Sequence, residues 1–302
     1  MATNVYTGLV AKVLAFGDVR EKPFHLDDEH NYLADGFGLG HVPDLIRILE
    51  DNELAEWDSD APEAWAQCHA WRILGQLRAV QAIVPLLNLL RYVDERDDDW
   101  VRDEVPVILA FIGADSLQPA ADFLADTKNG LWSRIAAVAT IEAIGNDYAE
   151  ARSRCVQIVS QQLEQFAEQD EILNASLVDC LVELKAVEAA PLMERAFAAG
   201  YVDLTLRGDW EEIQIDLGLL KERLTPKRNW VAEALFGPGW LGADDDDGED
   251  EWADEDEEDD EDQPALAEPR VVRQVVADPA KKKRKRKEAQ KQRKAQRRKK
   301  KK

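Results

Sequence analysis

Residues 63–93 read EAWAQCHAWRILGQLRAVQAIVPLLNLLRYV and contain two amphipathic stretches separated by a short turn. In both stretches apolar residues recur at spacings of three and four, which is the pattern of a helix with one buried face. Leu77-Arg78-Ala79 lies between the stretches and suits a tight interhelical turn. Pro85 suits the first turn of the second helix, where a missing N–H is not needed. The stretch therefore predicts a pair of helices.

The same pattern recurs along the chain. Counterparts of Leu77 follow at intervals of 35, 32 and 40 residues, each between two further amphipathic stretches: Ile112, Ile144 and Leu184. A proline recurs early in the second stretch, and also in one fragment upstream: Pro85, Pro119, Pro191 and Pro43. Helix pairs that repeat every ~30–45 residues are typical of an α-solenoid, in which each pair buries its apolar face against its neighbours. We expect an all-α solenoid, with a single irregular helical bundle as the alternative.

The repeats and the charge pattern divide the chain into six segments. We expect an N-terminal helical cap, the repeats and a C-terminal helical cap over 1–60, 61–200 and 201–242, because the end units of such arrays are atypical. An acidic linker, a Pro-containing linker and a basic tail follow over 243–262, 263–280 and 281–302. Dense runs of one charge repel themselves and bury little, so we expect the charged segments to be disordered interaction tails.

The charge of the chain limits its partners. The full sequence has 38 Lys and Arg and 61 Asp and Glu. Residues 243–302 contain 18 of the basic residues and 19 of the acidic residues. Residues 1–242 therefore contain 20 basic and 42 acidic residues. A body with this charge repels nucleic acid and anionic lipid at long range. Only the basic tail can attract a polyanion.

Three features predict a cytoplasmic protein. No apolar run reaches the ~18 residues that a membrane span needs. The N-terminal residues lack the basic, apolar and cleavage regions of a secretory signal. Cys68, Cys155 and Cys180 lie far apart within helical patterns, which indicates buried reduced thiols rather than a disulfide framework.

Several phrases resemble HEAT repeats of the class also found in phycobilin-lyase-like proteins, and more closely a bacterial family of HEAT-like proteins. They are GFGLGHVPDLIRILED, HAWRILGQLRAVQAIVPLL, DDDWVRDEVP, LWSRIAAVATIEAIG, LKAVEAAPLMERAFAAG and VDLTLRGDWEEIQIDLGL, within residues 30–220. The resemblance implies the solenoid fold and carries no reaction. Some related proteins end in a small Cys/His zinc module, but no cysteine follows Cys180 here.

The candidate metal sites have simpler explanations. His25 and His30 are five residues apart without a nearby cysteine, whereas zinc needs three or four closely spaced ligands. The acids of residues 97–104 could supply oxygen ligands to calcium but lack EF-hand spacing. We expect Asp99 to cap a helix that starts at Trp100, and Asp209 with Glu212 to form a capping box. His41 is expected at a helix start, and His69 between helices with one donated hydrogen bond. No metal or cofactor is expected.

No catalytic motif marks this chain as an enzyme. We find no nucleophile elbow, phosphate-binding loop, dinucleotide fingerprint or zinc-protease motif. The expected function is therefore that of a non-enzymatic protein–protein interaction scaffold. Two alternatives stay open: a phycobilin-lyase-like or other helper of cofactor attachment, and a structural scaffold whose tail only confers solubility.

Two sets of residues are the candidate contacts. Tryptophans near helix starts and turns either stack successive repeats or line a groove that anchors a partner, as exposed tryptophans often do: Trp65, Trp71, Trp100, Trp132 and Trp210. Cations of the tail would contact RNA, DNA or the ribosome through phosphates, without sequence preference: Lys281, Lys282, Lys283, Arg284, Lys285, Arg286, Lys287, Arg293, Arg297 and Arg298. No aromatic residue is interleaved in the tail, so no base stacking is expected there. The acidic linker is expected to neutralise part of the tail and to compete with nucleic acid.

Overall fold

The computed structural model describes residues 6–19, 31–54, 61–96, 98–231 and 233. The chain divides into one unit, Met1–Asp244, and a second, Asp245–Lys302, and all described residues belong to the first. Every regular element among them is a helix, which confirms the predicted all-α class. His25, His30, the two linkers and the basic tail lie outside the described residues.

The described part of the chain contains thirteen α-helices: α1 (Val10–Val13), α2 (Val42–Leu49), α3 (Ala66–Gln76), α4 (Ile83–Leu90), α5 (Val93–Arg96), α6 (Asp99–Ile112), α7 (Leu117–Ala125), α8 (Leu131–Asp147), α9 (Arg152–Leu163), α10 (Glu171–Glu183), α11 (Ala190–Ala198), α12 (Leu204–Arg207) and α13 (Trp210–Asp216). Short 3-10 helices precede or join several of them: Leu39–His41, Pro62–Trp65, Val80–Ala82, Ala114–Ser116, Phe166–Glu168 and Val187–Ala189. The four predicted helix pairs are present as α3 and α4, α6 and α7, α8 and α9, and α10 and α11.

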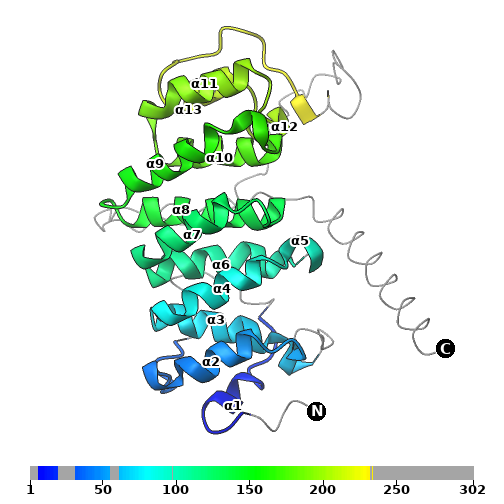
Figure 1. The fold of residues 1–302 in the computed structure, drawn as a ribbon, viewed down its shortest axis with the longest axis vertical. Coiled ribbons are helices and arrows are strands. Elements are labelled where there is room, and N and C mark those ends of the chain that lie inside the picture. The colour runs from blue at the N-terminus through cyan, green and yellow to red at the C-terminus, as the bar shows by residue number, and fades with distance from the viewer. Residues whose placement is uncertain (1–5, 20–30, 55–60, 97, 232, 234–302) are drawn as a thin grey trace, which may run out of the picture. The chain divides into compact units, whose positions relative to one another are not determined.

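The helices form two layers within the first unit (Figure 1). In one layer α3 contacts α6, α6 contacts α8, and α8 contacts α10. In the other, α4 contacts α7, α7 contacts α9, and α9 contacts α11. The layers are joined where the second helix of a pair packs on the first helix of the next, as α4 does on α6 and α7 on α8. Each pair therefore depends on its neighbour for its buried surface.

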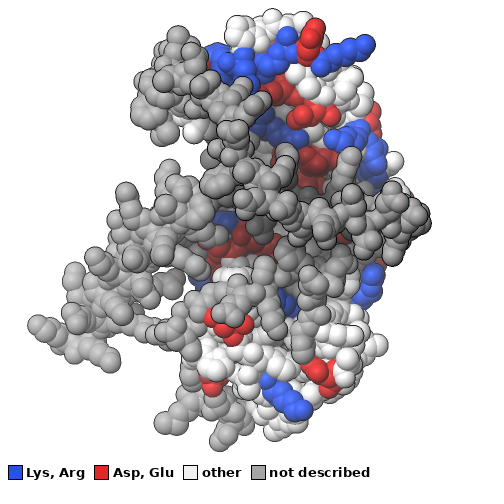
Figure 2. Space-filling model, turned by 180° about the vertical axis from the view of Figure 1, so that it is seen from behind, with Lys and Arg blue, Asp and Glu red and all other residues white. Residues whose placement is uncertain are grey.

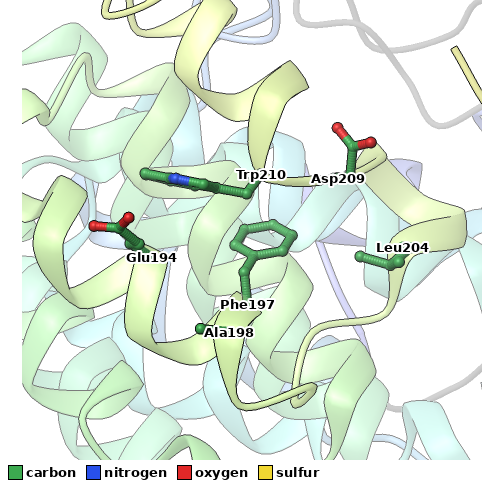
Figure 3. A pocket seen from close by; sticks show the side chains of 6 residues that line it. All are labelled: Glu194, Phe197, Ala198, Leu204, Asp209 and Trp210. Carbon is green, nitrogen blue, oxygen red and sulfur yellow. The ribbon is translucent and has the colours of Figure 1, made fainter. Parts of the chain in front are cut away.

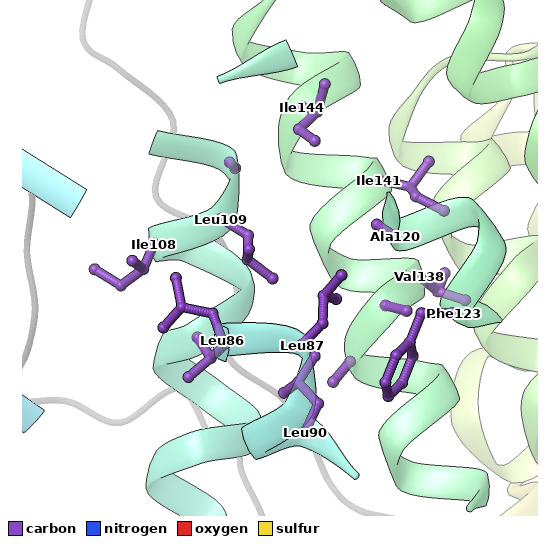
Figure 4. Close-up of a cluster of buried hydrophobic side chains, with 14 of the residues drawn as sticks. Leu86, Leu87, Leu90, Ile108, Leu109, Ala120, Phe123, Val138, Ile141 and Ile144 are labelled. Carbon is purple, nitrogen blue, oxygen red and sulfur yellow. The ribbon is translucent and has the colours of Figure 1, made fainter. Parts of the chain in front are cut away.

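The core lies between these layers. Leu86 of α4 faces Ile108 of α6, Leu90 of α4 belongs to the same cluster, and Phe123 of α7 lies near Val138 of α8 (Figure 4). All five side chains are buried. The spacing of three and four residues seen in the sequence thus corresponds to the faces that two adjacent helices bury against each other.

The recurring prolines lie where the sequence predicted them. Each occupies the second or third residue of its helix, in α2, α4, α7 and α11 respectively: Pro43, Pro85, Pro119 and Pro191. The first turn of a helix leaves its N–H groups without intrahelical acceptors, so proline removes no hydrogen bond there.

Two of the predicted interhelical turns use a left-handed residue that is not glycine. Arg78 and Lys185 have φ of 48° and 54°. After α3 the Ala79 N–H donates to the Leu74 carbonyl at 3.0 Å, which is the long hydrogen bond of a Schellman motif. Gly113 occupies the matching position after α6 with φ of 125°, a conformation open to glycine.

The third predicted turn falls inside a helix. α8 continues through Ile144 and Gly145 to Asp147. Gly145 is buried, and a Cβ atom at this position would lie 2.6 Å from Cδ2 of Leu184. The glycine is thus required by close helix packing rather than by a turn, so this part of the turn prediction is wrong.

A buried histidine anchors the N-terminal residues to α3. The Nε2 atom of His69 lies 2.9 Å from the Gly17 carbonyl, and its Nδ1 atom lies 2.6 Å from the Tyr32 hydroxyl. A carbonyl only accepts, so Nε2 carries the proton and Nδ1 accepts from Tyr32. The predicted role of His69 as a packed residue that donates one hydrogen bond is confirmed. His41 ends a 3-10 helix and precedes the first residue of α2, as predicted.

The three cysteines are buried, as their positions within helical patterns predicted. Cys68, Cys155 and Cys180 are buried and form no disulfide with one another. No single helix among the described residues has the length and apolar composition to cross a membrane. Among the same described residues, the segments Asp99–Ile112 and Ala114–Ala125 meet that test when taken together, with a bend of 120° between them.

Candidate interaction surface

Two of the five candidate tryptophans belong to the core. Trp65 is 6% exposed and Trp71 is 2% exposed. Trp100 is partly buried, and its ring stands nearly perpendicular to that of Trp65 at 5.7 Å between centroids. Trp65 and Trp71 therefore do not line a surface groove. Their large apolar area fills the junctions between neighbouring helices instead.

The other two tryptophans reach the surface to different extents. Trp132 at the start of α8 keeps 43% of its surface exposed. Trp210 at the start of α13 is partly buried against Phe197, with ring centroids 5.7 Å apart. Because Trp65 and Trp71 are buried, the five candidates do not form one exposed set.

Trp132 is held in place through its backbone. The carboxylate of Asp94, on α5, accepts hydrogen bonds from the N–H groups of Trp132 at 2.9 Å and Ser133 at 3.0 Å, and from the Ser133 hydroxyl at 2.5 Å. A Cβ atom on Gly130 would lie 2.3 Å from this carboxylate, so only glycine leaves room for it. Asp94 thus caps α8 from another helix and fixes the position of an exposed indole.

Two aromatic–arginine pairs lie on or next to α5, α6 and α8, which contact one another. Tyr92, two residues before Asp94, is 44% exposed, and the Arg96 guanidinium carbon lies 4.5 Å from its ring centroid. The Arg102 guanidinium carbon lies 6.0 Å from the Trp132 ring. We name these four residues the α8 platform: Tyr92, Arg96, Arg102 and Trp132. Only Trp132 was predicted, because which side of a short helix such as α5 is exposed depends on packing.

We expect Asp94→Ala to lower the free energy of unfolding by about 1–2 kcal/mol at pH 7, as the loss of a helix cap does. Burial raises the pKa of Asp94, but the hydrogen bonds from Ser133 and Trp132 outweigh it, so the pKa is lowered. This stabilisation is therefore present above the unfolded-state pKa of ~3.9 and is lost as the pH falls through the folded-state pKa. Urea unfolding at pH 7 and at pH 3 measures both effects. Asp103→Ala, an exposed carboxylate, is the matched control and should change little; an equal loss in both variants would contradict the cap.

The acids of residues 97–104 have separate structural roles. Asp98, not Asp99, is the N-cap of α6, and its carboxylate accepts from the Val101 N–H at 3.2 Å. Asp99 pairs with Arg102 at 2.8 Å, and Glu104 turns into the core. The predicted cap is thus displaced by one residue. In the described part of the chain no three His, Cys, Asp or Glu side chains are placed to hold a metal ion.

Glu104 forms a buried ion pair between α3 and α6. Arg72 is 5% exposed and Glu104 is 6% exposed. The guanidinium donates to both carboxylate oxygens, at 2.5 and 3.0 Å, and the Trp71 indole N–H donates to one of them at 2.8 Å. The carboxylate is therefore fully paired although it is removed from water.

A second charged cluster joins α8 and α10 to the C-terminal helices. Arg207 of α12 pairs with Asp179 and, at 3.1 Å, with Glu183 of α10. Burial raises the pKa of Glu142 on α8 to about 7, with further contributions from the Asp179 and Glu183 carboxylates that Arg207 partly offsets. The carboxyl group of Glu142 is thus partly protonated near neutral pH. Figure 2 shows acidic and basic side chains interspersed on one face of the molecule.

An apolar hollow lies beside α11 and α13 (Figure 3). It is open to the surface, has a volume of about 330 Å³ and is lined by six residues: Glu194, Phe197, Ala198, Leu204, Asp209 and Trp210. Asp209 accepts from the Glu212 N–H at 3.2 Å and is the N-cap of α13, which confirms that half of the predicted capping box. The Asp209 carboxylate is also paired with Arg223 at 2.5 Å.

Comparisons of the chain with protein-family models, with curated proteins and with solved structures found no match. The resemblance to HEAT-like proteins therefore depends on the sequence phrases alone. The function has to be inferred from the residues and the geometry of this chain.

Proposed function

We propose that this chain is a non-enzymatic, cytoplasmic interaction scaffold, built as an α-solenoid of HEAT-like helical hairpins, that holds a protein partner on the α8 platform. The main support is the two-layer arrangement, in which α3, α6, α8 and α10 contact one another in succession. Stacked pairs of this kind create an extended surface on which side chains keep fixed positions. Such a surface suits recognition of another protein.

The chemistry of the platform supports this role. Tryptophan, tyrosine and arginine dominate the binding energy of protein interfaces, and the platform has all three. The Trp132 backbone is fixed by Asp94, and Arg102 is held by its pair with Asp99 at 2.8 Å. Side chains that are already ordered lose less entropy on binding. A partner with apolar groups would match the exposed rings of Tyr92 and Trp132.

We propose that the basic tail adds weak, non-specific association with nucleic acid or the ribosome. Sixteen of residues 281–302 are Lys or Arg, and such a segment displaces counterions from a phosphate backbone. The net charge of −22 on residues 1–242 opposes the same contact. The tail can therefore tether the protein reversibly, while selection of a protein partner belongs to the repeats.

One capture experiment separates these two activities. The tagged full chain, a Tyr92→Ala/Trp132→Ala variant and a variant with the tail cations replaced by glutamine are each used to isolate partners, with and without nuclease. We expect the platform variant to capture at least ten-fold less of a nuclease-resistant protein partner than the full chain does, because two hot-spot side chains are removed. The tail variant should lose only nuclease-sensitive, salt-sensitive material.

The matched control is Leu224→Ala, which removes a large apolar side chain that is 77% exposed on another part of the surface. It should retain the partner. Unchanged capture by the platform variant would refute the assignment of the platform. Unchanged binding of RNA by the tail variant across a salt series would refute the role of the tail.

A further inference from the structure

The hollow beside α11 and α13 combines aromatic and acidic side chains. Glu194, Phe197 and Ala198 are spaced by three and four residues on α11, so they share one face of that helix. Trp210, the first residue of α13, packs beside Phe197 with 5.7 Å between the ring centroids. Figure 3 shows the Glu194 carboxylate next to these rings. The hollow therefore places a negative charge beside aromatic surface.

The carboxylate of Glu194 is open to a new partner. Glu194 is exposed, and among the described residues it forms no hydrogen bond or ion pair. Arg195 is its neighbour in the chain, but adjacent residues on a helix do not face each other. Asp209, the other acid of the lining, is already paired with Arg223 at 2.5 Å. Glu194 can therefore supply the charge that pairs with an incoming cation.

The two rings are also open to a cation. The negative face of an aromatic ring attracts a guanidinium group, and this chain uses that contact elsewhere. The guanidinium carbon of Arg228, for example, lies 4.0 Å from the Trp230 ring. Phe197 and Trp210 are both only partly buried and pack on each other, and no arginine of the described ranges lies over either ring.

We propose that this hollow binds an arginine side chain of a protein partner. A planar guanidinium group stacks on an aromatic face and pairs with a carboxylate, which are the two features that the hollow offers. The aliphatic part of the arginine would lie against Ala198 and Leu204. The net charge of −22 on residues 1–242 attracts a cationic partner. This site lies on α11 and α13, so it is separate from the α8 platform and goes beyond its proposed function.

The size and charge of the hollow disfavour other ligands. Its volume of about 330 Å³ is near the lower end of the ~300–1,000 Å³ of small-molecule pockets, which suits one side chain with its immediate neighbours. Glu194 and Asp209 would repel an anion, and also the α-carboxylate of a free amino acid. A neutral apolar ligand would take water from the Glu194 carboxylate without giving it a partner.

Binding of a short arginine peptide to the full chain tests this site. The probe is leucine–arginine–leucine with both ends blocked, followed by the indole N–H signal of Trp210 in ¹H–¹⁵N spectra. The Trp210→Phe variant assigns that signal. We expect a saturable shift with the arginine peptide and at least three-fold weaker binding when citrulline replaces arginine, because citrulline keeps the shape without the charge. The absence of a saturable shift, or equal affinity for the two peptides, would overturn the proposal.

A charge variant tests the role of Glu194. Glu194→Gln changes an exposed side chain, so the fold is kept, and it should weaken binding of the arginine peptide about three-fold. Glu53→Gln, at an exposed glutamate before α3, is the matched control and should bind as the unchanged chain does. The Tyr92→Ala/Trp132→Ala variant should also bind the peptide normally, which separates this site from the α8 platform. Equal affinity of Glu194→Gln and the unchanged chain would contradict the proposal.

Discussion

Replacement of Glu104 by glutamine is expected to lower the free energy of unfolding by about 3–5 kcal/mol. The variant removes the carboxylate charge that pairs with the Arg72 guanidinium at the buried contact between α3 and α6. Removal of one partner from a buried charge pair costs far more than the loss of one hydrogen bond. Urea unfolding followed by far-UV circular dichroism measures the change at pH 7.

The charge pair itself contributes less than the loss of one partner suggests. We therefore expect Arg72→Met/Glu104→Leu to recover most of the stability, because apolar side chains of similar volume need no charge compensation. The exposed pair of Arg47 and Asp44 provides the control: both side chains are 51% exposed, and Asp44→Asn should cost less than about 1 kcal/mol. A small effect of Glu104→Gln, comparable with that of Asp44→Asn, would show that the pair is not buried in solution.

The second large effect is expected at Glu142. Glu142→Gln should stabilise the protein by about 1–2 kcal/mol at pH 8 and have little effect near pH 4.5. Burial raises the pKa of this carboxyl group from 4.5 to about 7, so the folded state favours the neutral form. The stability that this neutral group contributes is complete below pH 4.5 and is lost as the pH rises to about 7. Glutamine keeps the shape of the neutral acid and does not ionise.

Thermal or urea unfolding of both proteins across pH 4.5–8.5 measures this effect. The expected result is a difference in stability that grows through this range and then levels off above pH 8. Glu150→Gln, an exposed glutamate that follows α8, is the matched control and should show no such trend. A difference that is the same at every pH would contradict the assignment to ionisation of Glu142.

The helices could be predicted well from the sequence, because a helix that buries one face has apolar residues at spacings of three and four. Apolar residues at spacings of three and four placed the helix pairs, and Pro43, Pro119 and Pro191 marked the starts of second helices. The position of Gly145 inside α8 could not be predicted. A glycine that allows close packing and a glycine that ends a helix look the same in a sequence, since the neighbour at Leu184 is 39 residues away.

The side-chain contacts were harder to predict than the helices. Burial of Trp65 and Trp71, and exposure of Trp132, depend on which side of each helix meets the next one. The sequence does contain a signal from which the Arg72–Glu104 pair could be predicted. Both residues interrupt apolar stretches, and their separation of 32 residues is close to the interval between repeats. With 61 acids in the chain, such a coincidence becomes informative only with the structure in hand.

The contacts between successive helices have a consequence for synthesis of the protein. Each helix packs mainly on helices that precede or follow it closely in the chain, as α4 does on α6 and α9 on α10. Folds with contacts of short sequence separation form rapidly, because little loop entropy is lost before contacts are made. Each helix pair can therefore pack on the preceding pair while the ribosome is still translating the next pair. The acidic linker and the basic tail leave the ribosome after the repeats, when a folded anionic surface is already present.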